Sequence, residues 1–290
     1  MSMINDFIEQ QLAVWPEVRE RYLALGKTER RRFRIGDLEG AFQYNPARRV
    51  STAAATDPAS VAARPCFLCA KNRPKEQMAI PLNADWEMLV NPYPIFPVHF
   101  TVISTAHRPQ DAPPLEMAGM ADHFPELCFF FNGARGGASA PDHLHLQAVL
   151  QSELPLLRIA EENHPADKPG IMRSDMWGLD LPFLFLSALI TDDEEGGRDY
   201  LRMLALTGGD ADGNPDKGLR NVFCWKGADG LLRMIVVPRQ KARPACYGEG
   251  PGRMLVSPGA IDMTGVVILP RREDFDAITP GKMREIYAEM

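Results

Sequence analysis

The sequence predicts an α+β fold in which two halves of similar style follow one another. Strand-like runs surround one glycine-rich loop in the first half, and in the second half strand-like runs return with one candidate helix. No segment repeats at a short fixed period, which argues against a solenoid and leaves a pseudo-duplicated arrangement open. The chain has 290 residues, the length of about two domains or one large unit. We expect an N-terminal arm with a first half in residues 1–165 and a second half in residues 166–290.

The N-terminal arm is predicted to consist of helices that pack against the rest of the chain. From residue 3 to residue 25, apolar residues recur near helical spacing, and Pro16 marks a break or a second helix start. The basic run Lys27–Arg34 is expected to be a solvated turn, with an edge that faces an anion as the alternative. A short strand is predicted over Gly40–Tyr44 and a loop over Ser51–Ala63.

Further strands are predicted from runs rich in β-branched and aromatic residues. In the first half, prolines separate two such runs and a candidate helix precedes two more; these elements are Trp86–Asn91, His99–Ser104, the helix Pro114–Phe124, Leu127–Asn132 and His143–Leu150. The stretch Ser152–Gly170 is the expected boundary. The elements predicted beyond it are a strand at Phe183–Ile190, a helix at Glu194–Leu206, an acidic turn at Gly208–Gly218, and strands at Leu219–Trp225 and Leu231–Val237.

Composition excludes several functional classes. Lys and Arg number 32 against 38 Asp and Glu, so the net charge is −6, which argues against a nucleic-acid scaffold. No apolar run reaches the ~18 residues of a membrane span, and the N-terminus carries no signal or transit pattern. We therefore expect a cytoplasmic protein that binds neither nucleic acid nor a membrane. Five cysteines are too sparse and odd in number for a disulfide framework, so any pair among them suggests a metal before a cystine.

The strongest candidate for chemistry is the run His143-Leu-His-Leu-Gln147. On a strand, side chains alternate between two faces, so His143, His145 and Gln147 share one face and the two leucines point to the other. A glycine-rich turn directly upstream favours a functional role for this polar face. The alternative is a buried pair of hydrogen-bonded imidazoles.

The upstream loop runs from Asn132 to Ser139 and suits a polyphosphate. Its small residues let backbone N–H groups approach an anion, and Asn132, Arg135 and Ser139 offer side-chain donors. Glycine clusters also mark ordinary tight turns, which is the alternative here.

Cys66 and Cys69 stand three residues apart and could grip one Zn²⁺, which usually takes four nitrogen or sulfur ligands. By position, His107 and His143 are the best candidates for the other two ligands. A redox pair and a structural thiol pair are the alternatives, although the surrounding prolines are poor material for the helix that a redox pair would need. The remaining cysteines, Cys128, Cys224 and Cys246, are expected to be buried small hydrophobes.

These motifs resemble the galactose-1-phosphate uridylyltransferase branch of the histidine-triad superfamily, and they occur in the same order. The resemblance rests on Cys66-Phe-Leu-Cys69, Asn91-Pro-Tyr-Pro94, Asn132-Gly133 with Gly137-Ala-Ser139, and His143-Leu-His-Leu-Gln147. The spacing from Gly137 to Gln147 and the tail Ser257–Gly265 are similar to GDP-hexose phosphorylases. The stretch Pro97–Ser104 is similar to diadenosine tetraphosphate phosphorylases.

The resemblance implies a histidine-triad-like antiparallel sheet with flanking helices and a catalytic first half. It implies that His145 attacks the α-phosphorus of a nucleotide and that Gln147 binds a phosphate oxygen. It further implies phosphate contacts from Asn132 and Ser139, in the loop that also holds Arg135 and Gly137. The matching metal ligands are Cys66, Cys69, His107 and His143, around a structural zinc. No organic cofactor is implied.

The expected function is transfer of a nucleoside monophosphate through a covalent nucleotidyl-histidine. The donor would be a nucleoside-diphosphate sugar, such as a GDP-hexose, or a dinucleoside polyphosphate, and the acceptor phosphate or a sugar phosphate; a homodimer stays open. A hydrolase of the same fold and a catalytically silent nucleotide-binding protein are the alternatives. Asp142 departs from the uridylyltransferase pattern, in which proline precedes the histidine directly. The second half lacks a histidine strand, and its basic residues Arg239, Lys241 and Arg243 are expected to form a solvated rim, with phosphate contact as the alternative.

Overall fold

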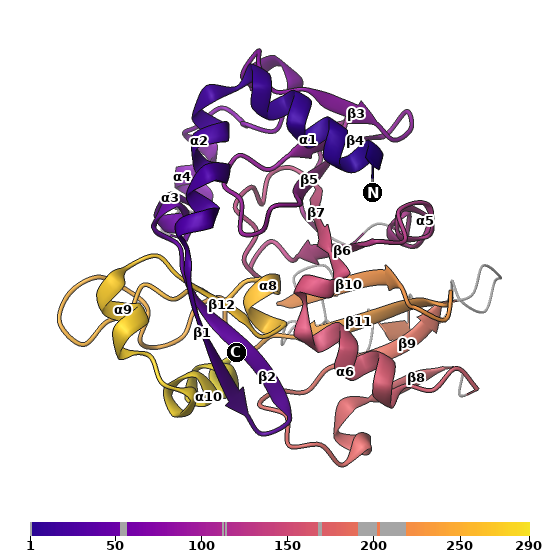
Figure 1. The fold of residues 1–290 in the computed structure, drawn as a ribbon, viewed down its shortest axis with the longest axis vertical. Helices are drawn as coiled ribbons and strands as arrows, with labels where there is room; N and C mark the ends of the chain where they lie inside the picture. Colours follow the sequence, from indigo (N-terminus) through magenta and orange to yellow (C-terminus); the bar gives the residue numbers. More distant parts are fainter. Residues whose placement is uncertain are drawn as a thin grey trace.

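The computed structural model describes residues 2–52, 57–111, 113, 115–167, 170–190, 202–203 and 219–290. One long twisted sheet runs through the molecule, with helices and a smaller sheet around it (Figure 1). This is the α+β architecture with an antiparallel sheet and flanking helices that the sequence predicts.

The large sheet has nine strands in the order β3-β4-β5-β7-β6-β10-β11-β9-β8, and every neighbouring pair is antiparallel. Strands from before residue 165 form one side of it and strands from after residue 165 the other. The first set is β3 (Ala79–Pro81), β4 (Trp86–Val90), β5 (His99–Ser104), β6 (Leu127–Asn132) and β7 (His145–Leu150). The second set is β8 (Ile171–Arg173), β9 (Leu186–Ile190), β10 (Arg220–Lys226) and β11 (Leu232–Pro238). The two sets meet where β6 pairs with β10.

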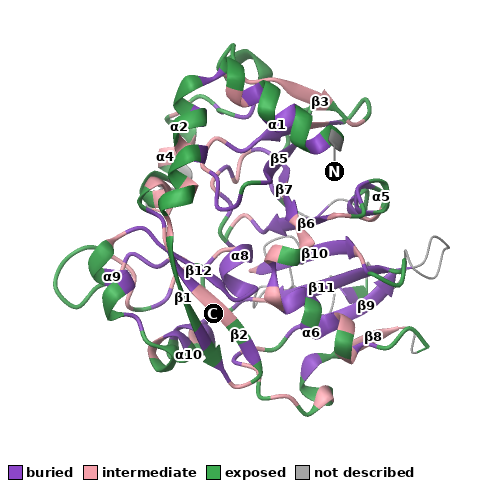
Figure 2. Cartoon of the chain, in the orientation of Figure 1, coloured by how far each residue is buried: buried purple, intermediate pink, exposed green. Residues whose placement is uncertain are grey.

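Apolar side chains cover both faces of this sheet because successive residues of a strand point to opposite sides. On β6, Phe129 and Phe131 pack with helices α1 (Ser2–Val14), α2 (Pro16–Ala24) and α5 (Met117–His123). The alternate residues Cys128 and Phe130 join the core on the opposite face. The helices of that face are α6 (Pro155–Asn163), α8 (Ala260–Met263), α9 (Arg272–Ala277) and α10 (Pro280–Glu289). Figure 2 shows the buried central strands and the exposed outer sides of the helices.

A three-stranded sheet packs within the second of these cores. It contains β1 (Glu29–Ile35), β2 (Leu38–Tyr44) and β12 (Val266–Leu269), in the order β1-β2-β12, with β12 parallel to β2. Close approach requires Gly40, where an added Cβ would lie 2.2 Å from the carbonyl oxygen of Gly265. The C-terminal part of the chain thus returns to the N-terminal part.

Several predicted elements are confirmed, and others are wrong. The two N-terminal helices meet at Pro16, and the predicted strands of both halves are present within a few residues. Most of the basic run Lys27–Arg34 belongs to a strand rather than a turn, because Glu29–Ile35 pair with β2; Phe33 and Ile35 are buried there and the arginines are exposed. The expected loop at Ser51–Ala63 contains helix α4 (Pro58–Ala62), and the expected boundary Ser152–Gly170 contains α6. The short helix α3 (Arg49–Thr52) precedes α4.

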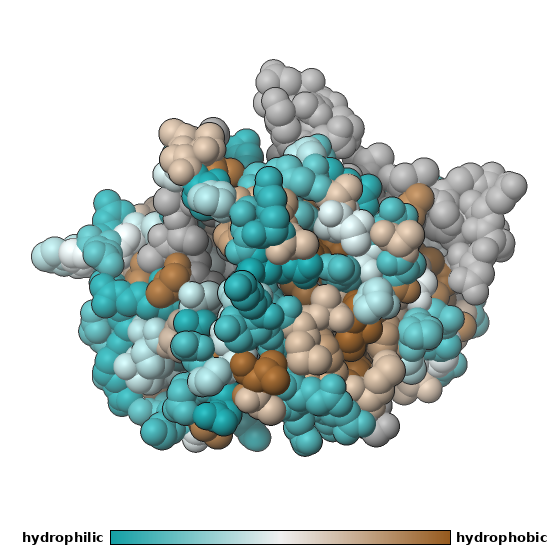
Figure 3. All heavy atoms as spheres, turned by 90° about the horizontal axis from the view of Figure 1, so that it is seen from above, coloured by the Kyte–Doolittle hydropathy of each residue, from teal (hydrophilic) through white to brown (hydrophobic). Residues whose placement is uncertain are grey.

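Cys128 and Cys224 are buried as predicted, whereas Cys246 is half-buried. The predicted helix at Glu194–Leu206 and the turn at Gly208–Gly218 lie outside the described residues, apart from two helical positions at 202–203. Among the described residues, no helix has the length and apolar character needed to cross a membrane. Hydrophilic side chains dominate the face seen from above in Figure 3, with apolar ones in small groups between them.

Candidate active site

The imidazole of His145 lies at the start of β7 with one nitrogen left for chemistry. Its Nδ1–H donates to the carbonyl oxygen of His143 at 2.8 Å, so Nε2 carries the free lone pair. Burial lowers the pKa of His145 to about 4, and the ring is therefore neutral at pH 7. The side chain is 3% exposed. On the other face of the strand, Leu144 and Leu146 enter the core, as the alternation predicts.

Gln110 fixes the backbone on both sides of this histidine. Its Oε1 accepts the backbone N–H of His145 at 2.7 Å, and its Nε2 donates to the carbonyl oxygens of His145 and Asn132 at 2.8 and 2.9 Å. The side chain is completely buried. Gln110 therefore holds the first residue of β7 against the last residue of β6. No pattern in the sequence singles it out, because it stands alone in a proline-containing connection.

Gln147 is oriented by a second buried histidine. The backbone N–H of Ile95 donates to His99 Nδ1 at 3.1 Å, so the proton of His99 sits on Nε2 and donates to Gln147 Oε1 at 2.8 Å. Burial and the nearby Arg48 charge lower the pKa of His99 to about 3, which preserves this neutral form. The amide nitrogen of Gln147 is thus left for a partner outside the sheet.

Asn132, at the end of β6, is oriented in the same way. Its Oδ1 accepts the backbone N–H of Ala260 at 2.8 Å and the side-chain amide of Asn221 at 3.0 Å. A backbone N–H can only donate, so the atom that faces it must be the oxygen. Both carboxamides that the sequence singles out therefore have their oxygens occupied by the protein and their N–H₂ groups available.

The glycine-rich loop after Asn132 packs tightly against the second half of the chain. The N–H of Gly133 donates to the carbonyl oxygen of Arg220, and the N–H of Gly136 donates to that of Gly133. A Cβ on Gly136 would lie 2.6 Å from the Arg220 carbonyl oxygen, and one on Gly137 would lie 3.1 Å from the Cα of Gly259. These glycines serve close packing, and the N–H groups of Gly133 and Gly136 are already used within the loop.

A cavity of about 190 Å³ lies beside this loop. Its lining includes five of the predicted site residues: Asn132, Arg135, Gly137, Ser139 and Gln147. His145 is not among the lining residues, but it precedes Gln147 by two positions on the same face of β7. The cavity is therefore lined by the two oriented amides, and His145 lies one step further along the same face of β7.

Basic residues from outside the loop also line the cavity. Arg48 and Arg243 do so, and Arg48 Nη1 donates to the carbonyl oxygen of Tyr93 at 2.7 Å while its buried Nε has no hydrogen-bond partner. The prediction of a solvated rim is wrong for Arg239, which is 6% exposed and donates to the buried Asn221. Arg48 was not predicted from the sequence, because it stands beside Arg49 in a segment without a recognisable motif.

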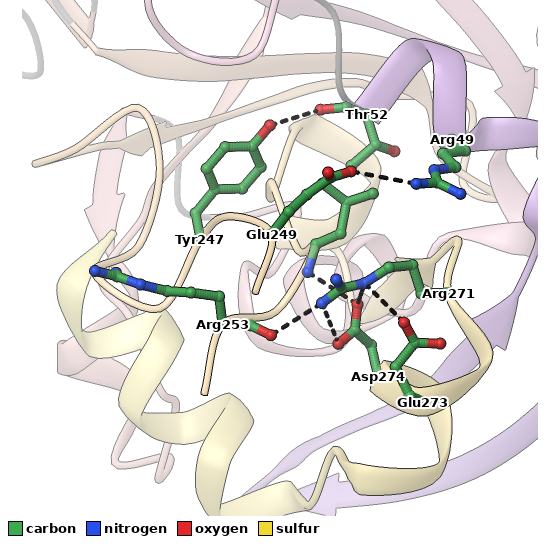
Figure 4. A network of polar contacts seen from close by, with 9 residues as sticks. Arg49, Thr52, Tyr247, Glu249, Arg253, Arg271, Glu273 and Asp274 are labelled. Atoms are coloured by element: carbon green, nitrogen blue, oxygen red, sulfur yellow. Dashed lines mark hydrogen bonds and ion pairs between the residues drawn. The ribbon is translucent and has the colours of Figure 1, made fainter. Parts of the chain in front are cut away.

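The segment 242–259, whose two ends line the cavity, is tied to the first half, as Figure 4 shows. The hydroxyl of Tyr247 donates to the carbonyl oxygen of Thr52 at 3.4 Å, and Arg49 pairs with Glu249 at 3.3 Å. In the same view Arg271 contacts Arg253, Glu273 and Asp274, and the N–H of Leu255 donates to the Asp274 carboxylate at 2.9 Å. The wall is therefore built from both ends of the chain.

The four predicted metal ligands lie together beside this site. The ligand atoms of Cys66, Cys69, His107 and His143 are all within 4.8 Å of one another. The Sγ atoms of Cys66 and Cys69 lie 3.2 and 3.6 Å from His143 Nδ1, and Cys69 Sγ lies 3.2 Å from His107 Nδ1. His143 Nε2 donates to the carbonyl oxygen of Ser104 at 2.8 Å, which directs the Nδ1 lone pair into the cluster. The cluster has the composition and geometry of a metal centre.

Burial and a nearby ion pair affect the cluster of two cysteines and two histidines. Burial raises the pKa of the Cys66 thiol, so a bound cation would have to displace its proton. Asp142, where the sequence departs from the uridylyltransferase pattern, accepts from Arg64 at 3.0 Å, and the same guanidinium donates to the carbonyl oxygen of Ser139 at 3.4 Å. The extra residue therefore helps to hold the end of the glycine loop.

Comparison with known proteins agrees with this architecture. A family model described as a domain of unknown function, DUF4922, matches residues 7–150. No curated protein matches the sequence. The crystal structure of yeast Ap4A phosphorylase Apa2 in complex with AMP matches at 15% identity with a TM-score of 0.62, covering 93% of each chain. Its complex with Ap4A matches at 14% identity with a TM-score of 0.60, covering 95% of each chain. The chain thus shares the fold of yeast Ap4A phosphorylase Apa2 over nearly its whole length, in agreement with the antiparallel sheet and flanking helices that the sequence predicts.

Proposed function

We propose that this protein is a nucleotidyltransferase that passes a nucleoside monophosphate through a covalent bond to His145. The donor would be a dinucleoside polyphosphate or a nucleoside-diphosphate sugar, and the acceptor phosphate or a sugar phosphate. One observation carries the proposal: a neutral imidazole with a free Nε2 lies beside two carboxamides whose N–H₂ groups are left for a ligand. The likeness in fold to a phosphorylase solved with AMP and with Ap4A supports nucleotides as ligands.

The reaction follows from these atoms as two displacements at phosphorus. In the first, the Nε2 lone pair of His145 forms a bond to the α-phosphorus, and the bond to the departing phosphate oxygen breaks with its electron pair. The ring then carries positive charge, which the carbonyl oxygen of His143 stabilises through Nδ1–H. In the second, an oxygen of the acceptor attacks phosphorus and the neutral imidazole leaves. Two inversions give net retention at phosphorus.

Gln147 and Asn132 would bind the oxygens on which negative charge develops. Their N–H₂ groups are held in place before the substrate arrives, so no reorganisation is needed at the moment of reaction. Arg48, Arg135 and Arg243 bring positive charge to the same cavity, which suits the remaining phosphates of the donor or an anionic acceptor.

We further propose that the cluster of two cysteines and two histidines holds a structural zinc. Two sulfur and two nitrogen ligands are the set that Zn²⁺ takes in closed tetrahedral sites. Bound there, the metal would supply rigidity rather than chemistry. It would fix His143, whose carbonyl oxygen accepts from the nucleophile.

Our division at residue 165, the cytoplasmic location and the homodimer stay predictions.

The test is mass spectrometry of the intact protein. Incubation with Ap4A, ADP-glucose or GDP-hexoses is expected to add one nucleoside monophosphate, and added phosphate is expected to remove it. His145→Asn is expected to keep the fold and to form no adduct, and substantial turnover by this variant would exclude the covalent route. Release of the nucleotide without any acceptor would favour the hydrolase. Binding with no adduct in the intact protein would favour the silent nucleotide-binding protein.

A further inference from the structure

Asn132 is held by residues from the second half of the chain. Its register partner on β10 is Asn221, whose Nδ2 donates to Asn132 Oδ1 at 3.0 Å. The N–H of Ala260 supplies the second donor to the same oxygen. Because both donors come from beyond residue 165, the orientation of this cavity-lining amide is not decided by its own half.

Asn221 can take only one orientation. Its Oδ1 accepts from Arg239 Nη1 at 2.7 Å, and its Nδ2 also donates to the carbonyl oxygen of Gly136 at 2.9 Å. A guanidinium can only donate and a carbonyl oxygen can only accept, so a rotation of the Asn221 amide would break both contacts. Asn221 is completely buried, so water cannot replace them.

Arg239 is in turn fixed by two carbonyl oxygens of the second half. Its Nη2 donates to the carbonyl oxygens of Pro258 and Lys241 at 3.0 and 3.3 Å. Burial lowers the pKa of Arg239 to about 10, while the carboxylate of Asp262 opposes this shift. Asp262 accepts the N–H groups of Gly259 and Ile268, which holds the turn that presents the Ala260 donor. A buried guanidinium is costly to keep. Here Nη1 holds Asn221, and Nη2 holds the carbonyl oxygen of Pro258, two residues before the Ala260 donor to Asn132.

We infer that Arg239 and Asn221 are positioning residues that aim the amide of Asn132 at the transferred phosphoryl group. The relay runs from Arg239 through Asn221 to Asn132, and it ends in a donor on the cavity. This inference rests on the proposed function, because it gives the second half a task in that reaction. Neither positioning residue lines the cavity.

A double-mutant cycle tests the relay. Arg239→Met is expected to lower kcat for phosphorolysis by about tenfold to a hundredfold, less than the loss of a whole charge-stabilising donor. In an Asn132→Ala background the same change is expected to have no further effect on kcat, because its only route to the substrate is gone. Arg239→Lys is expected to recover part of the loss. Equal losses in both backgrounds, or an unchanged kcat in Arg239→Met, would overturn the relay.

Two further variants separate positioning from folding. Arg233→Met removes another buried arginine of the same sheet, one that pairs with Asp229, and it is expected to leave kcat unchanged. Asn221→Asp keeps the size of the side chain and adds a charge complementary to Arg239. It loses the donor to Asn132, so kcat should fall even if Arg239→Met does not fold. Losses of kcat that simply follow melting temperature across all variants would refute the inference.

Failure of the proposed function can be distinguished from failure of the relay. If the intact protein forms no nucleotidyl adduct with any donor, the proposed function fails, and the affinity for AMP, measured by calorimetry, still tests the relay. Arg239→Met is then expected to weaken AMP binding in the native background and not in Asn132→Ala. Equal weakening in both backgrounds would leave the second half without this role.

Discussion

At the scale of single residues, the site depends on atoms whose hydrogen-bonding roles are forced by unambiguous neighbours. Backbone N–H groups fix the acceptors on His99, Asn132 and Gln110, and from these the roles of the remaining atoms follow. The free atoms that result, His145 Nε2 and two amide nitrogens, belong to side chains on one face of the sheet. The sequence alone predicts which residue types share that face, but not which of their atoms are already occupied.

Gln147→Glu tests the value of one such free atom. Glutamate still accepts from His99 Nε2–H, so the fold is expected to survive, but the donor toward the cavity is replaced by negative charge. The rate of adduct formation is expected to fall by about a hundredfold to a thousandfold. Single-turnover mass spectrometry measures it, with melting temperature as the control for folding. A rate within a few fold of the native protein would contradict the role given to this amide.

His99 predicts how stability depends on pH. Its pKa is about 3 when folded and 6.5 for the ordinary side chain, so between these values the unfolded chain binds a proton that the folded chain does not. The free energy of unfolding therefore falls as the pH decreases below 6.5, by up to about 1.4 kcal/mol per pH unit from this group. Urea unfolding at pH 7 and pH 5 measures the slope. It should be shallower in His99→Asn, and an identical slope would contradict the assignment.

At the scale of elements, the glycine loop shows where sequence reasoning stopped. The composition of residues 133–137 predicted a phosphate-binding loop or an ordinary tight turn, and the structure adds a reason for glycine that lies in another element. Gly136 packs against the backbone of β10, which is 84 positions further on at Arg220. A pattern along the chain contains no information about such a distant steric neighbour. The same holds for Gln110 and for the strand at the basic run, where pairing with β2 decided the structure.

Gly136→Ala is expected to destabilise the protein by about 1–3 kcal/mol, because the new Cβ would meet a carbonyl oxygen at 2.6 Å. Adduct formation should also slow, since the loop has to move away from β10. Gly119→Ala in α5 is the matched control. An added Cβ there has nothing within 4 Å, so helix propensity should raise stability by up to about 1 kcal/mol. Chemical denaturation of both variants gives the comparison, and equal effects would refute the steric argument.

At the scale of the whole molecule, the cysteine and histidine cluster joins three separate segments. Cys66 and Cys69 come from the loop before β3, His107 from the connection after β5, and His143 from the approach to β7. Their spacing let the sequence predict the set, because residue type and order carried the signal. Other residues that support the site, such as Arg239, do so through contacts with residues far away in the sequence. Such contacts leave no comparable pattern in the sequence.

Elemental analysis of protein purified without added metal is expected to find about one zinc per chain. A Cys66→Ser, Cys69→Ser double variant should lose the metal and melt at a temperature lower by about 5 °C or more, because binding energy at such a site is folding energy. Cys128→Ser, on a buried strand, controls for the loss of a thiol away from the cluster. Full retention of metal by the double variant would show that Cys66 and Cys69 do not bind it.

The pairing of β6 with β10 also bears on how the protein can be divided for experiments. A fragment that stops at residue 150, where the family match ends, would keep His145, the proposed nucleophile, but leave β6 as an open edge with its hydrogen-bonding groups exposed. Unpaired edges of this kind recruit strands from other copies. Such a truncation is therefore expected to precipitate or self-associate, whereas co-expression with residues 151–290 offers the missing neighbour and a route to a reconstituted enzyme.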